Sequence, residues 1–112
     1  MRIYYKKKHF TVDVKKVSLF ERFSGLMFKN SMTDNLLFEF KKDNDLSIHS
    51  LFVFFPFLAL WIGDKNKVID FRIVESFSLS VTPKRKFRKL VELPMNKKNK
   101  KIFDFFVGKG KV

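Results

Sequence analysis

Ile48-His49-Ser50-Leu51-Phe52-Val53-Phe54-Phe55-Pro56-Phe57-Leu58-Ala59-Leu60-Trp61-Ile62 is the most apolar stretch of this sequence. From Leu51 to Ile62 no side chain carries a charge. The stretch is shorter than the about 20 apolar residues that a membrane-spanning helix needs. Pro56 would also break a helix, because its nitrogen has no proton to donate and its ring clashes with the preceding turn. The stretch therefore predicts two strands, about 46–54 and 57–63, with Pro56 at an edge, a bulge or a strand start.

A stretch that is apolar on both faces is typical of strands covered on both sides, so we expect it to be buried. The alternative is an exposed patch that binds a membrane surface or a partner. The expected core residues are Val12, Val14, Phe20, Phe23, Met27, Leu36, Phe38, Phe52, Phe54, Leu58, Leu60, Ile69, Phe71, Ile73 and Val91.

The rest of the chain alternates apolar and polar residues in short runs, which is typical of strands. The predicted strands cover residues 2–7, 10–14, 36–40, 68–74, 76–82, 87–93 and 105–107. Ser18 and Glu21 fit a capping box and predict a short helix at 18–27, and residues 95–104 could form a helical turn. We expect a mainly β fold, a single-domain sandwich or partly closed barrel with one short helix near residues 18–27, which occupies residues 1–112.

The composition excludes several kinds of site. There is no cysteine, so disulfides, thiolate metal sites and cysteine nucleophiles are excluded. Only two histidines are present, and the carboxylates show no metal-ligand spacing, so we expect no metal. Gly108 to Lys111 resembles a phosphate loop, but no helix follows it, and we expect no cofactor there.

Positive charge dominates the chain. Lys and Arg number 24 against 11 Asp and Glu, a formal net charge of +13. This balance favours an anionic partner, either a nucleic acid such as RNA or, less favoured, an acidic membrane surface. Because the excess is mostly lysine, a bias of the genome toward A/T-rich codons is the alternative explanation. The candidate anion-binding residues are Lys84, Arg85, Lys86, Arg88, Lys89, Lys97, Lys98, Lys100 and Lys101.

Two further groups of residues are candidates for ligand contacts. His49 enters the apolar stretch, and Ser47 would share its face of a strand, so a small-ligand pocket could include His49, Ser47 and Trp61. The alternative for His49 is a histidine hydrogen-bonded within the sheet. Phe87, between Lys86 and Arg88, is the nearest local case of a base-stacking aromatic.

Three blocks of sequence are similar to those of a known family. They are residues 25–29 (Gly-Leu-Met-Phe-Lys), 36–40 (Leu-Leu-Phe-Glu-Phe) and 48–56, and the blocks at 67–70 and 90–94 extend the match. The family is domain of unknown function 192, also called uncharacterised ACR, and the chain resembles its archaeal branch over roughly residues 10–112. The resemblance implies a mainly β domain with a short helix after the first strand, and no known activity.

The resemblance and the composition lead to one functional expectation. Bacterial members of the family often carry an export signal and this chain shows none, which predicts a cytoplasmic location. We expect a non-enzymatic binding or interaction module with a basic face for an anionic partner. The alternative is a small-ligand domain or an enzyme with an aromatic pocket near His49.

Overall fold

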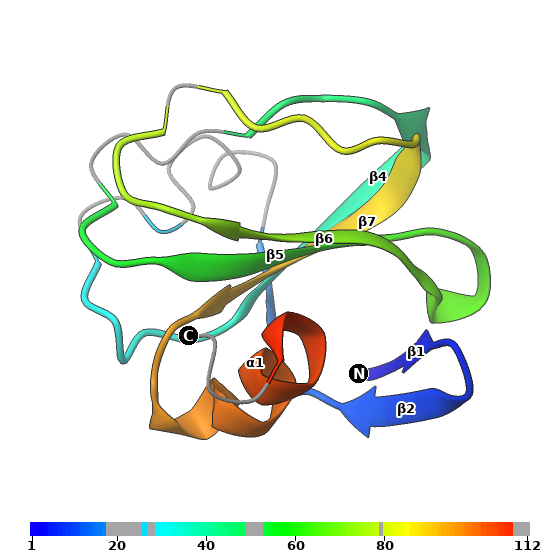
Figure 1. The fold of residues 1–112 in the computed structure, drawn as a ribbon. Coiled ribbons are helices and arrows are strands. Elements are labelled where there is room, and N and C mark those ends of the chain that lie inside the picture. Colours follow the sequence, from blue (N-terminus) through cyan, green and yellow to red (C-terminus); the bar gives the residue numbers. More distant parts are fainter. Residues whose placement is uncertain (18–25, 27–28, 49–52, 79, 109–112) are drawn as a thin grey trace.

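A five-stranded sheet forms the centre of the fold (Figure 1). The computed structural model describes residues 1–17, 26, 29–48, 53–78 and 80–108. The strands of this sheet are β3 (Lys15–Lys16), β4 (Leu36–Asn44), β5 (Phe57–Ile62), β6 (Val68–Val74) and β7 (Phe87–Pro94). Their order is β3-β4-β7-β5-β6, and every neighbouring pair is antiparallel except β3 and β4.

The apolar stretch supplies β5, which is paired with β6 on one side and β7 on the other. All six of its residues are buried, and those from Leu58 to Ile62 have an exposed fraction of 0%. The predicted strand at 57–63 is therefore confirmed to within one residue. It begins directly after Pro56, where the missing N–H is not needed by the ladder of β5.

The predicted strand at 46–54 is not formed in the residues that are described there. Ile48 makes a single bridge to Val81, and residues 53 and 54 are irregular. Phe54 was expected in the core, and that prediction is wrong because 60% of its surface is exposed. The chain joins the sheet only at Phe57. Phe54 is therefore not part of a strand, and the rule that alternate side chains face the core does not apply to it. Residues 49–52, including His49, lie outside the described residues.

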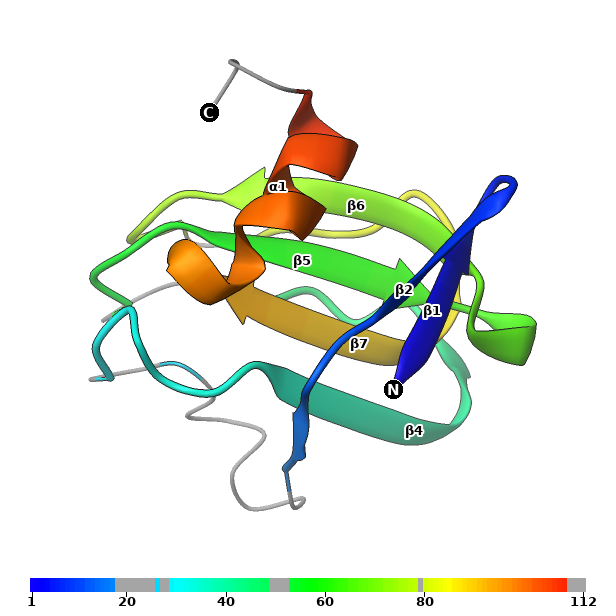
Figure 2. The same ribbon diagram turned by 90° about the horizontal axis from the view of Figure 1, so that it is seen from below.

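Each face of the sheet has a different cover. The face that carries Leu58, Leu60 and Ile62 is covered by the helix α1 (Lys100–Val107) and by a hairpin, and we call it the helix face (Figure 2). The hairpin is a second sheet made of β1 (Arg2–Tyr5) and β2 (Lys8–Thr11). The opposite face, with Ala59 and Trp61, is covered by connecting segments, and we call it the loop face. The residues that cover it are Val17, Leu26, Val53, Phe55 and Val81.

The α-helix found among the described residues lies near the C-terminal end of the chain. A 3-10 turn, η3 (Lys97–Asn99), leads into α1, which continues to Val107, so the predicted strand at 105–107 is wrong. Ile102, Phe103 and Phe106 recur at helical spacing and are buried against the helix face. The predicted helix at 18–27 lies outside the described residues, except for Leu26 in a turn. A mainly β single domain with a short helix is confirmed, and the described strands form no closed barrel.

A register shift in β6 changes the direction of one side chain. Trp61 pairs with Asp70 but Ile62 pairs with Val68, so Ile69 is an extra residue between them. Phe71 packs on the helix face as the alternation predicts, whereas Ile69 packs against the loop-face cluster. The sequence pattern had placed Ile69 and Phe71 on the same face.

Asn99 joins three parts of the chain from a buried position. Its Nδ2 donates to the carbonyl of Pro94 at 2.7 Å and to Oδ1 of Asn35 at 2.8 Å. Its backbone N–H donates to Oδ1 of Asn96 at 3.2 Å. The end of β7, the start of α1 and the segment before β4 are therefore fixed to one another by one amide side chain.

We expect Asn99→Ala to lower the free energy of unfolding by roughly 1–3 kcal/mol, because the buried carbonyl of Pro94 loses its donor. Asn30→Ala is the matched control, since Asn30 accepts a local bond from Met32 N–H in an exposed turn. Its effect should stay within about 0.5 kcal/mol. Urea unfolding of both variants measures the difference, and equal losses would contradict the role given to Asn99.

Candidate anion-binding cleft

The candidate cations are divided between the two ends of β7. Lys84, Arg85 and Lys86 precede the strand, whereas Lys97 to Lys101 follow it on η3 and α1. Strand residues rise about 3.3 Å each, so the two groups are separated by roughly 23 Å. We call the end of the sheet at which β7 begins, near Arg85 and Lys86, the cleft end. The other end, at which β7 finishes and where the exposed Phe54 and Phe77 lie, is called the aromatic end.

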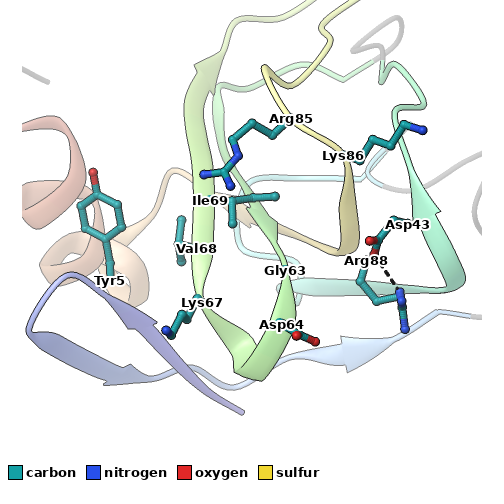
Figure 3. Close-up of a pocket in the computed structure, with 10 residues that line it drawn as sticks. All are labelled: Tyr5, Asp43, Gly63, Asp64, Lys67, Val68, Ile69, Arg85, Lys86 and Arg88. Carbon is teal, nitrogen blue, oxygen red and sulfur yellow. Dashed lines mark hydrogen bonds and ion pairs between the residues drawn. The ribbon is translucent and has the colours of Figure 1, made fainter.

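A cleft of about 650 Å³ lies at the cleft end, where β5 ends and β6 and β7 begin (Figure 3). Its basic lining residues come from the link before β7, from β7 itself and from the start of β6. The lining residues are Tyr5, Asp43, Gly63, Asp64, Lys67, Val68, Ile69, Arg85, Lys86 and Arg88. Arg85 lies over Ile69, while Tyr5 is set apart from the other labelled side chains (Figure 3).

The shape of the cleft depends on one hydrogen bond and on one glycine. The N–H of Lys84 donates to Oδ2 of Asp70 at 2.9 Å, which fixes the link carrying Arg85 and Lys86 against β6. Gly63 forms part of the wall, and a Cβ placed on it would lie 3.2 Å from Cγ2 of Ile69. The absence of a side chain at Gly63 therefore permits the close approach of the two strands.

Positive charge exceeds negative charge around the cleft. Four cations line it, Lys67, Arg85, Lys86 and Arg88, against the carboxylates of Asp43 and Asp64. Nε of Arg88 pairs with Oδ1 of Asp43 at 3.1 Å. The other three cations have no ion pair within the described part of the chain. A planar guanidinium can bind a phosphate with two parallel hydrogen bonds, so Arg85 is suited to that ligand.

Lys89 is occupied in a different contact. Its Nζ donates to Oδ1 of Asn66 at 2.9 Å, and Nδ2 of Asn66 donates to the carbonyl of Arg2 at 3.1 Å. Asn66 has a φ of 59°, a conformation that asparagine tolerates better than most residues. Lys89 and Asn66 thus fix the N-terminal hairpin to the sheet beside the cleft.

The residues expected around a small-ligand pocket do not line this cleft. Ser47 is exposed, and its hydroxyl lies 2.7 Å from that of Thr82. Trp61 is fully buried on the loop face, and its indole nitrogen has no hydrogen-bond partner among the described residues. Since His49 lies outside those residues, the structure does not place the three candidates together.

Phe87 does not present its ring to a ligand. Its exposed fraction is 1%, and it packs edge-on against Phe40 with ring centroids 5.5 Å apart. Phe87, the nearest local case of a base-stacking aromatic in the sequence, is therefore too deeply buried to stack on a base. The aromatic residues of the helix face pack in the same way, and the ring of Phe106 lies 5.3 Å from that of Tyr5.

Sequence reasoning missed Glu92, the only charged residue that is buried in the described part of the chain. It pairs with Ala59 of β5 and Leu36 of β4 in the middle of the sheet. By strand alternation it shares the loop face with Leu90 and is a diagonal neighbour of Trp61. A carboxylate in an otherwise apolar central strand was the signal that could have identified it.

Burial in these apolar surroundings raises the pKa of Glu92 from its ordinary value of 4.5 to about 8. Desolvation is the cause, because removing the carboxylate from water disfavours its charged form. No described residue forms a salt bridge with Glu92. The carboxyl group is therefore protonated at neutral pH.

We expect Glu92→Gln to remove a pH dependence of stability. The raised pKa of the folded state means that the native protein is most stable relative to this variant below about pH 4.5. That stability is lost as the pH rises toward 8. Above pH 8 the variant should gain up to roughly 5 kcal/mol over the wild type. Urea unfolding at pH 5 and 8.5 measures the gain, and parallel pH curves for the two proteins would contradict it.

Within the described residues there is no group of three or more His, Cys, Asp or Glu side chains that could hold a metal ion. No helix in the described part of the chain has the length and apolarity to cross a membrane.

Comparison with known proteins identifies one family and two similar structures. A model of the uncharacterised ACR family, domain of unknown function 192, matches residues 3–102. No curated protein matches the chain. A crystal structure from Sinorhizobium meliloti 1021, described as a "putative transcription regulator", has a TM-score of 0.74 at 18% identity and covers 90% of this chain and 82% of its own.

A second structure, a protein of unknown function from Novosphingobium aromaticivorans DSM 12444, has a TM-score of 0.65 at 12% identity. The match covers 84% of this chain and 69% of that one. At these identities the two likenesses show that the fold is shared.

Proposed function

Because the chain belongs to the uncharacterised ACR family, whose name assigns no activity, we propose from the geometry that it is a non-enzymatic binding module for RNA phosphates. The observation that carries the proposal is the cleft lined by Lys67, Arg85, Lys86 and Arg88. Three of these cations have no ion pair within the described residues, so phosphate oxygens can take that place. The formal charge of +13 would attract a polyanion from a distance.

The lining of the cleft favours contacts with the RNA backbone over readout of the RNA bases. Its lining contains two arginines and two lysines, but its one aromatic residue, Tyr5, packs its ring against Phe71 and Phe106. Contacts to phosphates carry little sequence information, whereas contacts to the bases determine which sequence is bound. Binding should therefore be strongly salt dependent and nearly independent of RNA sequence. The likeness to the Sinorhizobium meliloti protein supports the shared fold only.

Filter binding of a single-stranded RNA 20-mer tests the proposal. Affinity should fall steeply between 50 and 300 mM salt, because each phosphate contact releases counterions. Arg85→Gln with Lys86→Gln should weaken binding about tenfold and lower the salt slope by about 1.4. The matched control, Lys97→Gln with Lys98→Gln, removes the same charge at the aromatic end and should bind as the wild type.

Two outcomes would contradict this function. One is the absence of binding at 50 mM salt. The other is an equal loss for both pairs of substitutions, which would mean that total charge attracts RNA and that the cleft has no special role.

A second candidate function, a small-ligand site on the loop face, is favoured by two buried polar groups. The indole N–H of Trp61 is a buried donor without a described acceptor, and the protonated carboxyl of Glu92, its diagonal neighbour, can donate as well, so their ligand would supply carbonyl oxygens. The single indole resonance of the 15N-labelled protein can be titrated with small neutral amides. A shift that disappears in Glu92→Gln would support this site, and an unmoved resonance would contradict it.

A further inference from the structure

Two phenylalanines at the aromatic end are more than half exposed to solvent. Phe54 is 60% exposed and Phe77 is 55% exposed, and their ring centroids lie 5.6 Å apart at an interplanar angle of 75°. Phe54 precedes β5 and Phe77 follows β6, so two connecting segments bring the rings together. Large aromatic side chains are usually buried, and an exposed pair in contact is a feature that needs an explanation.

The backbone of Phe77 is in an unfavourable conformation. Its φ is 63°, in the left-handed region that a bulky residue rarely adopts. Glycine would fit this position without strain. Such strain is typical of sites where the fold holds a side chain in place for a function. Here it accompanies a ring that is 55% exposed.

Two lysines lie at the same end of the sheet as the aromatic pair. The N–H of Met95 donates to the carbonyl of Pro56 at 3.0 Å, which joins the segment leading to Lys97 and Lys98 to the loop that holds Phe54. Both lysines are exposed, and neither has an ion pair among the residues the structure describes.

The segment before β4 reaches the same end. Nδ2 of Asn96 donates to the carbonyl of Ser31 at 2.7 Å, and the next residue, Met32, is 55% exposed. The carboxylates carried by these segments are those of Asp34 and Glu75.

We propose that the aromatic end docks onto an anionic lipid bilayer, with Phe54, Phe77 and Met32 inserted at the level of the headgroups and with Lys97 and Lys98 bound to anionic lipids. The two rings are in contact and more than half exposed, and exposed apolar side chains of this kind can enter the interface of a bilayer, whereas an amphipathic helix of a partner protein needs a groove. Lysines beside exposed apolar side chains add electrostatic attraction to such a surface.

This orientation has a structural consequence. The cleft lies at the opposite end of β7, roughly 23 Å away by strand length, so a docked molecule presents it toward the aqueous side. Lipid docking does not depend on the proposed RNA binding, because the two use different residues.

Vesicle co-sedimentation of the 112-residue chain tests the proposal. Vesicles of phosphatidylserine and phosphatidylcholine (roughly 30:70) should bind the protein, and pure phosphatidylcholine should bind it much more weakly. Phe54→Ser with Phe77→Gly should lower the partition coefficient about tenfold or more. The glycine suits the left-handed backbone, so this variant should fold, and the emission of the single buried Trp61 checks it.

Matched controls use the other end of the sheet. Leu46→Ser removes an apolar side chain that is 53% exposed beyond the end of β4, and it should bind as the wild type. Lys97→Gln with Lys98→Gln should weaken binding about tenfold or more, whereas Arg85→Gln with Lys86→Gln should have a small effect.

Three results would overturn the proposal. The first is a failure to bind anionic vesicles at low salt, which would leave an acidic protein as the occupant of this surface. The second is unchanged binding of the Phe54 and Phe77 variant. The third is an equal loss for the two pairs of cation substitutions, since that would indicate adsorption by total charge alone.

Discussion

Burial of β5 on both faces is the constraint on which the rest of the fold depends. Leu58 to Ile62 are completely removed from water, so each face of the sheet requires its own apolar cover. The helix face obtains it from α1 and the N-terminal hairpin, and the loop face from connecting segments. With both faces occupied, the two ends of the sheet are among the places where the described chain offers charged and aromatic side chains to a partner.

The two ends differ in chemistry, although their lysines are close in sequence. Arg85 and Lys86 lie at one end and Lys97 and Lys98 at the other, because β7 runs straight through the sheet between them. The lysines and arginines between residues 84 and 101, which the sequence predicted to form one basic face, are thereby divided between a cleft with arginines and an end with exposed phenylalanines. The geometry of a strand, about 3.3 Å per residue, is sufficient to separate the two groups.

The interior also contains an ionisable group, the carboxyl of Glu92, whose charge state affects stability. A carboxyl group between Ala59 and Leu36 destabilises the fold whenever it is charged, and protonation is how the protein accommodates it. Trp61 adds a second buried donor on the same face. Among the described residues these two polar groups lie in an otherwise apolar layer, where an unpaired donor lowers stability, and for that reason a ligand is proposed there as the second candidate function.

The sequence by itself determined the mainly β class, the strands predicted at 57–63 and 87–93 to within one residue, and the burial of Leu36, Leu58 and Val91, because alternation and β propensity are local properties. Only the tertiary structure decided the rest. Phe105 and Val107 are helical because Phe106 packs on the sheet. Phe54 is exposed because the chain enters β5 later, and Arg85 reaches a cleft because Asp70 binds the preceding link. These outcomes depend on contacts between residues far apart in the chain, which no local pattern encodes.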